Sequence, residues 1–310
     1  MSTQAHSPAI AAKGLTKRFG DLIAVDGIDL TVERGELFAL LGPNGAGKTT
    51  TIKMLCCLLR PTSGTATVMG HDVRTNSLSV KQVINVSPQE TAIAEHLNAW
   101  ENLALIAGLH GVDAARARHT AGELLEMLGL ANRASDKAKK LSGGMKRRLS
   151  LAMALISDPD VLFLDEPTLG LDAQSRRAIW SHIEDLKGSK TILHTTHYLE
   201  EADALADRIA IIDEGKVVAS GSTQELKRSI SDGQAMSIEA ANVTDESIAA
   251  LSEFCMVTRT GVGVDIRGDV LLYDIVDVLR PMGVVIESAS KKSVTLDDVF
   301  VELTGKELRE

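Results

Sequence analysis

Aromatic residues and long apolar runs are both scarce in this chain. Phe, Trp and Tyr make up 3% of its 310 residues, which argues against a surface that stacks the bases of single-stranded nucleic acid. No stretch of about 18 uninterrupted apolar residues occurs, so we expect no segment that crosses a bilayer. Residues 1–14 also lack the basic and then apolar pattern of a signal peptide. The sequence therefore predicts a cytosolic protein.

Cysteine is rare as well, and its spacing matches no metal site. Cys56 and Cys57 are adjacent, and Cys255 lies far from both in the sequence. An odd number of cysteines without a metal-binding spacing is typical of thiols that act as small apolar side chains. We therefore expect no redox role for them.

Positive charge is in deficit, mainly in the last part of the chain. The formal net charge is −9, and residues 231–310 hold 15 Asp and Glu but 7 Lys and Arg. The first 230 residues are close to neutral. Neither part has the basic stripe expected of a nucleic acid binder. The acidic excess is typical of a solvated surface, and we expect no nucleic acid partner.

A glycine-rich segment, GPNGAGKT at residues 42–49, matches the phosphate-loop pattern G-x-x-x-x-G-K-[ST]. It follows the apolar run 37–41 and precedes a helix-like stretch at 50–59, which is the context that the pattern requires. Its glycines let backbone N–H groups approach phosphate oxygens, and the next helix adds its positive end. Lys48 would contact the β- and γ-phosphates, and the Thr49 hydroxyl would bind Mg²⁺.

A second segment ends in two carboxylates. Residues 161–164 are apolar and precede Asp165 and Glu166. Four apolar residues in a row are typical of a strand buried on both faces. Asp165 would then emerge at the carboxyl end of the sheet, where open α/β folds bind ligands, and would hold the Mg²⁺ shell through water. Glu166 would act as general base on the attacking water. Alone, this pattern is equally typical of a strand that ends in an acidic turn.

A third segment, LSGGM at residues 141–145, precedes a basic helix. Ser142 is a good N-cap, and the two glycines after it expose backbone N–H groups. One nucleotide needs only one such phosphate-binding helix terminus, so a second one suggests a nucleotide held from two sides. An ordinary capped helix would have the same spacing.

The pattern along the chain predicts an α/β fold. Alternating strands and helices indicate a parallel sheet covered by helices, with an antiparallel edge sheet in residues 9–35 made of three short strands at 10–12, 22–25 and 28–32. We expect a first domain over residues 8–229, with a helical subdomain at about 95–140, and a small α+β domain over 234–310 after a linker at 231–233. Further strands are expected at 64–68, 83–86, 161–164, 190–194, 209–212, 235–240, 256–266 (a hairpin) and 284–288. Residues 98–129 are expected to be rich in helix, and single helices are expected at 142–156, 244–254, 270–279 and 296–303.

Over residues 8–228 the chain resembles an ATP-binding subunit of an ATP-binding-cassette (ABC) transporter. The family's motifs occur in order: Walker A at 42–49, the glutamine loop at 87–89, the signature at 141–145, Walker B at 161–166, the D-loop at 171–172 and the switch histidine at 195–197. The resemblance implies a P-loop NTPase fold, with ATP and Mg²⁺ as cofactors and ATP hydrolysis as the reaction.

The resemblance also implies roles for individual residues. Catalysis would involve Glu166, His197 and Lys48. ATP would be contacted by Phe19, Gly42, Asn44, Gly45, Ala46, Gly47, Lys48, Thr49, Thr50 and Gln89, and Mg²⁺ by Thr49, Gln89 and Asp165. ATP on a second copy of the chain would be contacted by Ser142, Gly143, Gly144 and Asp172. Phe19 would stack on adenine, although many relatives carry Tyr there and a lone Phe is equally typical of a core.

One Walker A motif and one signature per chain imply a head-to-tail dimer with two ATP molecules between its chains. The family implies separate transmembrane permease subunits and a place on the cytoplasmic face of the membrane. Residues 294–305 are similar to the end of ATPases in the daunorubicin-resistance and lipid-exporter branch, which favours a drug, antibiotic or lipid-like cargo. Their apolar spacing is also typical of a packed terminal helix. The acidic residues 234–310 would serve dimerisation or regulation.

Two other functions stay open. A soluble ABC ATPase that acts on ribosomes or DNA would usually carry two cassettes or a long coiled-coil insertion, and a basic surface; the sequence has none of these. A P-loop kinase or another small NTPase would not need LSGGM or the Thr196-His197 pair.

Overall fold

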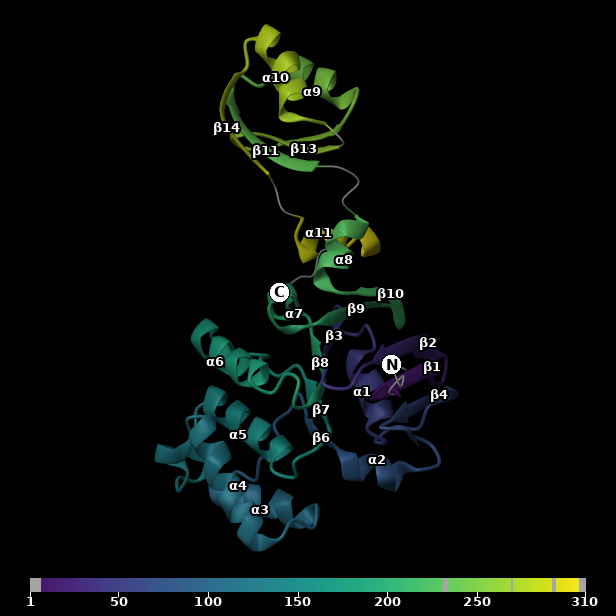
Figure 1. Ribbon diagram of the computed structural model, residues 1–310, viewed down its shortest axis with the longest axis vertical. Coiled ribbons are helices and arrows are strands. Elements are labelled where there is room, and N and C mark those ends of the chain that lie inside the picture. Colours follow the sequence, from purple (N-terminus) through teal and green to yellow (C-terminus); the bar gives the residue numbers. More distant parts are fainter. Residues whose placement is uncertain (1–6, 231–233, 269, 292–293, 307–310) are drawn as a thin grey trace, which may run out of the picture. The chain divides into compact units, whose positions relative to one another are not determined.

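The chain forms two units in a computed structural model that describes residues 7–230, 234–268, 270–291 and 294–306 (Figure 1). The first unit ends at Ser222, and the second begins at Thr223 with helix α8 (Thr223–Ser229). We expected the first domain to extend to residue 229. The expected linker at 231–233 lies outside the described residues.

The first unit is organised around a six-stranded sheet. Its strands lie in the order β10-β9-β3-β8-β7-β6, and all pairs are parallel except the pair of β10 and β9. The strands are β3 (Leu37–Leu41), β6 (Ile84–Ser87), β7 (Val161–Asp165), β8 (Thr191–Thr196), β9 (Arg208–Asp213) and β10 (Lys216–Gly221). The predicted parallel core sheet is confirmed, while strand β10 was not predicted.

An antiparallel sheet of four strands adjoins the first. Its order is β2-β1-β4-β5, with β1 (Ile10–Phe19), β2 (Leu22–Val32), β4 (Ser63–Val68) and β5 (His71–Asp72). The predicted edge sheet is confirmed, but the prediction of three short strands in residues 9–35 was wrong. Gly14 and Gly27 have positive φ angles of 57° and 67°, and the β1–β2 register shifts between Ala12 and Leu15. These glycines sit in irregular stretches of two long strands and do not end them.

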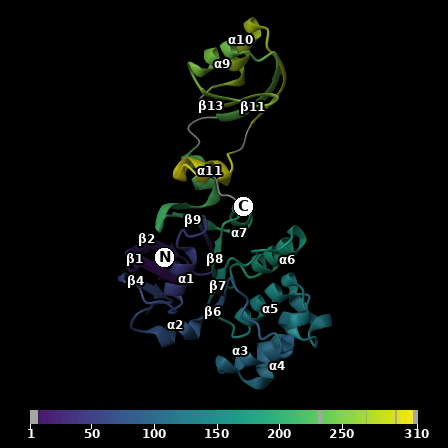
Figure 2. The same cartoon turned by 180° about the vertical axis from the view of Figure 1, so that it is seen from behind.

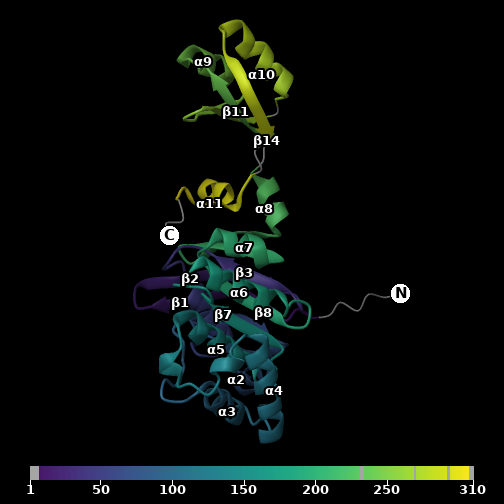
Figure 3. The ribbon, with the colours of Figure 1, turned by 90° about the vertical axis from the view of Figure 1, so that its left-hand side faces the viewer.

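Helices cover both faces of the parallel sheet. Helix α1 (Lys48–Leu55) and the antiparallel sheet bury one face, around Phe38 and Phe163. The helices α3 (Ala99–Leu109), α4 (Ala114–Met127), α5 (Gly143–Leu155) and α6 (Ala173–Glu184) bury the other face. Figures 1 and 2 show these two groups on opposite sides of the central strands, and Figure 3 views the unit from the side of α5 and α6. Strand β7 is therefore buried on both faces, as its apolar run predicts.

Several helices begin or end differently from the prediction. Residues 98–129 form two helices because the chain turns at Gly111, whose φ is 70°, and Asp113 accepts hydrogen bonds from the first N–H groups of α4. Helix α1 ends at Leu55 and not at residue 59, and Cys57 then adopts a positive φ of 59°. The sequence did not predict α2 (Ser77–Val83), α6 or α7 (Leu199–Leu205).

The second unit contains a ferredoxin-like sandwich. Its elements are β11 (Gln234–Ala241), α9 (Asp245–Ser252), β12 (Met256–Arg259), β13 (Gly263–Gly268), α10 (Leu272–Leu279) and β14 (Val285–Lys291). The strands are antiparallel in the order β12-β13-β11-β14, which with two helices is the β-α-β-β-α-β arrangement. Ile238 and Ile266 on the sheet pack with Leu251 and Ile275 on the helices. The final helix α11 (Leu296–Thr304) contacts α8, and the predicted small α+β fold is confirmed.

Among the described residues, no helix combines the length and the apolar character needed to cross a membrane.

A buried histidine lies in the middle of the parallel sheet. His194 on β8 is 0% exposed, and neither of its ring nitrogens has a hydrogen-bond partner among the residues that the structure describes. Burial lowers the pKa of His194 to about 4. The folded unit therefore keeps this ring neutral at pH values where an unfolded chain protonates it.

This histidine predicts acid sensitivity of the first unit. The pKa of His194 is lowered on folding, so its protonation favours the unfolded chain as the pH falls below about 6.5. We expect wild type to lose roughly 2 kcal/mol more unfolding free energy between pH 7.5 and pH 5 than the variant His194→Leu. Urea titration followed by tryptophan fluorescence measures this unit alone, because Trp100 and Trp180 are the two tryptophans of the chain.

The matched control is His110→Leu, which makes the same substitution at an exposed position of the same unit. If the unfolding free energy changed as steeply with pH in His194→Leu as in wild type, His194 would not be the cause of the acid sensitivity.

Candidate functional site

The loop between β3 and α1 forms a cradle of backbone groups. Gly47 has a φ of 102°, and a Cβ atom there would lie 2.5 Å from the carbonyl oxygen of Ala24. A Cβ atom at Gly42 would lie 2.1 Å from the carbonyl oxygen of Ile212. Side chains at these two positions are excluded, so the loop keeps the form that points N–H groups at an anion. The Lys48 ammonium donates to the carbonyls of Gly42, at 2.6 Å, and Pro43, at 3.1 Å.

A cavity of about 300 Å³ opens above this loop. It brings together most of the residues that the sequence predicts to contact ATP: Asn44, Gly45, Ala46, Gly47, Lys48, Thr49, Thr50 and Gln89, together with Glu166. Gly42, the first residue of the loop, does not line the cavity. Two hollows on the helical region are larger, about 590 and 560 Å³, but contain none of the motif residues, so size alone does not locate the site.

Phe19 lies at the end of β1 and is 47% exposed. It does not line the cavity at the phosphate loop. The Lys17 ammonium lies 5.0 Å from the centre of its ring. Phe19 is thus a surface aromatic residue and not a core residue, and Lys17 covers one face of its ring.

Asp165 and Thr49 meet at the carboxyl end of the sheet. One carboxylate oxygen of Asp165, Oδ1, accepts hydrogen bonds from Thr49 Oγ1 at 3.0 Å and Thr195 Oγ1 at 2.7 Å. The sequence predicted Thr49 and Asp165 but missed Thr195, which β8 places beside Asp165. The described residues contain no cluster of three or more His, Cys, Asp or Glu that could hold a metal. Hydroxyl and carboxylate oxygens at a phosphate site suit Mg²⁺, which takes its other ligands from water and phosphate.

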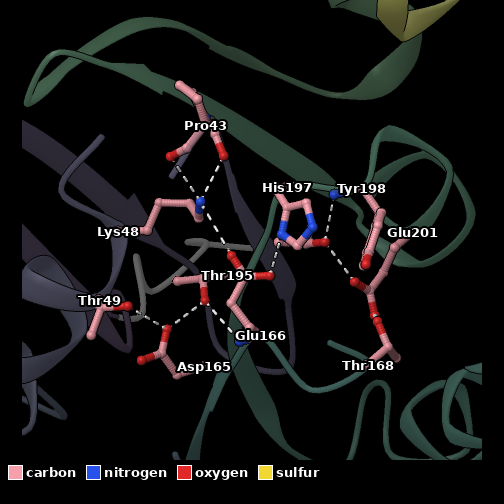
Figure 4. A network of polar contacts seen from close by, with 12 residues as sticks. Pro43, Lys48, Thr49, Asp165, Glu166, Thr168, Thr195, His197, Tyr198 and Glu201 are labelled. Atoms are coloured by element: carbon pink, nitrogen blue, oxygen red, sulfur yellow. Dashed lines mark hydrogen bonds and ion pairs between the residues drawn. The ribbon is translucent and has the colours of Figure 1, made fainter. Parts of the chain in front are cut away.

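Glu166 is the centre of a buried ionic group, shown in Figure 4. Its Oε1 lies 3.2 Å from Lys48 Nζ, and its Oε2 lies 2.7 Å from His197 Nδ1. Residue Glu166 is 4% exposed and has a φ of 51°, in the left-handed region that non-glycine residues rarely adopt. The structure therefore brings Glu166 into direct contact with each of the other two predicted catalytic side chains.

The pKa values in this group follow from burial and from the close charges. Burial raises the pKa of Glu166, but His197 and Lys48 together outweigh burial and hold that pKa below its usual value. Burial lowers the pKa of Lys48, and Glu166 and Asp165 oppose this effect. Glu166 is thus a carboxylate at neutral pH in this arrangement.

A second buried carboxylate fixes the segment that carries His197. Glu201 on α7 is 0% exposed. It accepts hydrogen bonds from Thr168 Oγ1 and Trp180 Nε1, both at 3.0 Å, and from Thr196 Oγ1 at 2.6 Å. These donors come from the turn after β7, from α6 and from the end of β8. Figure 4 shows Glu201 beside Thr168. Glu201 was not predicted from the sequence, because two of its three donors, Thr168 and Trp180, are 33 and 21 positions away.

The signature residues lie at the start of α5. Ser142 caps this helix and accepts a hydrogen bond from the Met145 N–H at 3.3 Å. Gly143 and Gly144 form its first turn, and none of the three lines the cavity at the phosphate loop. Helix α1, which follows that loop, packs on the opposite face of the sheet.

Asp172 adjoins the signature residues. It caps α6 and accepts from the Ser175 N–H at 2.9 Å and the Ser175 hydroxyl at 2.8 Å, and these two bonds lower the pKa of its carboxyl. A Cβ atom on Gly144 would lie 2.9 Å from that same hydroxyl oxygen. The four residues predicted to contact ATP on a second chain thus form one cluster, away from the cavity of their own chain.

Comparisons with known proteins agree with this geometry. Residues 25–169 match the family model for ABC transporters. The chain is 42% identical to the daunorubicin resistance ATP-binding protein DrrA3 of Streptomyces coeruleorubidus, over 97% of each chain. It is 39% identical to the Nod factor export ATP-binding protein I of Burkholderia lata, over 96% of this chain and 97% of that protein.

Solved structures show the same fold. The ATP-binding subunit of an ABC transporter matches with a TM-score of 0.66 and 29% identity, over 71% of this chain and 92% of that one. The ATP-binding cassette MJ0796, solved as a dimer in a post-hydrolysis state with ADP and Pi, matches with a TM-score of 0.63 and 26% identity, over 69% of this chain and 98% of that one.

The phosphate cradle, the buried Glu166 group and the relatives that match almost the whole chain lead to one conclusion. The chain belongs to the ABC transporter family, as an ATP-binding subunit of the drug-exporter type, and is an ATPase.

Proposed function

We propose that two copies of this chain close head-to-tail around two ATP molecules and thereby drive a membrane exporter. The observation that carries the proposal is the separation of the two anion-binding helix starts. The start of α1 lies at the cavity with Lys48, whereas the start of α5, with Ser142 and Gly144, lies outside it. A second chain brings the two together over one nucleotide. The dimer of MJ0796 with ADP and Pi supports this arrangement.

In each site, the residues of one chain bind the nucleotide and Mg²⁺. The loop of residues 42–50 surrounds the phosphates with N–H groups, and Lys48 adds a charge. Thr49 and Asp165 hold Mg²⁺ together with Gln89, and Mg²⁺ neutralises phosphate charge when it is bound. Phe19 provides an exposed ring for adenine. In the partner chain, Ser142, Gly143, Gly144 and Asp172 contact the same nucleotide.

Glu166 acts as general base on water, and its strength depends on Lys48. In the structure, the Lys48 ammonium lies 3.2 Å from the carboxylate and helps to hold its pKa low, so Glu166 is a weak base. When Lys48 turns to a phosphate, the carboxylate loses this counter-charge while it stays buried. Its pKa then rises, and it becomes a stronger base. His197 keeps the carboxylate oriented through Nδ1.

The membrane partner follows from the same reasoning. We propose that one or two transmembrane permease subunits contact the region of Gln89 and the helices within residues 95–135, with the chain on the cytoplasmic face of the membrane. The relatives named for daunorubicin resistance and for Nod factor export support a drug, antibiotic or lipid-like cargo. The second unit serves dimerisation or regulation. The names of these relatives support export and give no support to a soluble ATPase on ribosomes or DNA.

The first test removes the general base. We expect Glu166→Gln to lose about a hundredfold or more of ATP turnover, because an amide does not accept a proton from water. ATP affinity should persist, since the loop and Lys48 remain. Analytical ultracentrifugation should show a dimer with Mg-ATP, because ATP that is not hydrolysed keeps the two chains closed.

Glu123→Gln is the matched control, because the Glu123 side chain is 65% exposed on the helical region. It should hydrolyse ATP like wild type. Full turnover by Glu166→Gln would remove Glu166 from the catalytic role, and a monomer with bound Mg-ATP would contradict closure.

The second test identifies the membrane partner. Tagged Glu166→Gln protein is purified from gently solubilised cells of its own source in the presence of Mg-ATP, and the proteins that accompany it are counted by mass spectrometry. We expect a polytopic membrane protein in a fixed ratio to the chain. Lys48→Ala, which should bind ATP poorly because it lacks the phosphate contact, is processed in parallel to show which contacts need ATP. Ribosomal proteins or DNA in place of a membrane protein would contradict the exporter.

A further inference from the structure

One buried arginine on α5 holds both loops that flank the nucleotide cavity. Arg147 is 5% exposed. Its Nε donates to the carbonyl oxygen of Pro167 at 2.6 Å. Its Nη1 donates to the carbonyl oxygens of Pro88, at 2.9 Å, and Gln89, at 2.8 Å. Its Nη2 donates to the carbonyl oxygens of Asp165, at 3.2 Å, and Glu166. All five N–H groups of the guanidinium are thus used, and every acceptor is a backbone carbonyl.

The acceptors belong to two short segments and to no other part of the chain. Pro88 and Gln89 follow β6, and residues 165–167 are the last residue of β7 and the two residues after it. These strands are neighbours in the sheet, so both segments leave it at the same edge. The first contains the glutamine that lines the cavity, and the second contains Glu166. Arg147 therefore joins two loops with site residues and does not simply fill a core.

The turn at Glu166 needs such support. Glu166 has a positive φ of 51°, a backbone conformation that costs about 1–3 kcal/mol for a residue other than glycine and lasts only where its surroundings enforce it. Arg147 binds the carbonyl before this residue, its own carbonyl and the carbonyl after it. Three consecutive carbonyls bound to one planar group leave this turn little freedom to relax.

A buried guanidinium is a costly way to achieve packing alone. Burial lowers the pKa of Arg147, with Asp165, Glu201 and Glu166 acting in the opposite direction. No carboxylate forms an ion pair with it among the salt bridges of the described residues. An apolar side chain of similar size would avoid the desolvation of a charge. Hydrogen bonds that hold the backbone of the two loops in place would account for this cost.

We propose that Arg147 is a positioning residue that fixes the backbone of Glu166 and Gln89 to the signature helix. Ser142 lies at the start of the same helix, about 7 Å along its axis from Arg147. A shift of α5 when Ser142 and Gly144 contact ATP on the partner chain therefore moves the catalytic turn of its own chain. Arg147 would in this way link the two nucleotide sites of the dimer. The inference rests on the proposed role of Glu166.

The test compares Arg147→Lys with Arg148→Lys. Lysine keeps the charge of Arg147, but its three donors at one point do not reach both loops. Arg148 is the matched control, because it is the next residue of α5 and donates to the single carbonyl of Leu128, which a lysine can also reach. Turnover, the KM for ATP, ATP affinity and amide hydrogen exchange are measured for both variants and wild type.

We expect the kcat of Arg147→Lys to fall tenfold to a hundredfold, with KM and ATP affinity within about threefold of wild type. Amide exchange should speed up in residues 88–90 and 165–168 and stay unchanged in β3 and α1. Arg148→Lys should behave like wild type in all four measurements. A fall in kcat without a change in KM, together with faster amide exchange in these two segments alone, distinguishes a positioning role from a general loss of stability.

Three results would overturn the proposal. The first is a kcat within twofold of wild type in folded Arg147→Lys. The second is faster exchange throughout the first unit, together with equal losses of kcat and ATP affinity. The third is failure of both Arg147→Lys and Arg147→Gln to fold, because Arg147 would then serve stability alone. Glu166→Gln separates this inference from the proposed function: if that variant hydrolyses ATP normally, the role of Glu166 fails, whatever Arg147 does.

Discussion

The site depends on the backbone turn that follows β7. Glu166 has a positive φ of 51° there, and this conformation turns its carboxylate toward Lys48 and His197. Two buried groups hold the turn from different sides. Arg147 binds its carbonyls, and Glu201 binds the hydroxyl of Thr168. The signature helix contacts this turn through Arg147, and the helix after the switch histidine contacts it through Glu201.

The same turn explains how the charge of the site is balanced. Lys48 and Glu166 are both buried and neutralise each other, and either one alone would be a costly buried charge. An incoming phosphate competes for Lys48, and Glu166 is then left with His197. Binding of ATP thus both fills the cradle and changes the basicity of the carboxylate. Phosphate binding by Lys48 and base catalysis by Glu166, which the sequence assigns to separate motifs, are thus coupled through their charges.

The sequence predicted the elements whose signal is local. The phosphate loop, the strand before Asp165 and the capped helix at Ser142 each have a short pattern with a physical cause, and most of the residues at the cavity were predicted from them. It did not predict the long strands β1 and β2, because Gly14 and Gly27 act as breaks in a local pattern although the pairing continues through them. It also missed Thr195, Glu201 and Arg147. Apart from the contact of Glu201 with Thr196, their partners are 18 to 59 positions away, which no local pattern contains.

The central claim is that each site is shared between the phosphate loop of one chain and the signature of another. It is tested most directly by disulfide formation between Asn44→Cys on one chain and Ser142→Cys on a second, with Cys56, Cys57 and Cys255 replaced by Ala in a Glu166→Gln background. Both positions are exposed in the single chain. The account predicts a cross-linked dimer when the two variants are mixed with Mg-ATP, and none when either variant is alone. Equal cross-linking within one variant, or none in the mixture, would contradict it.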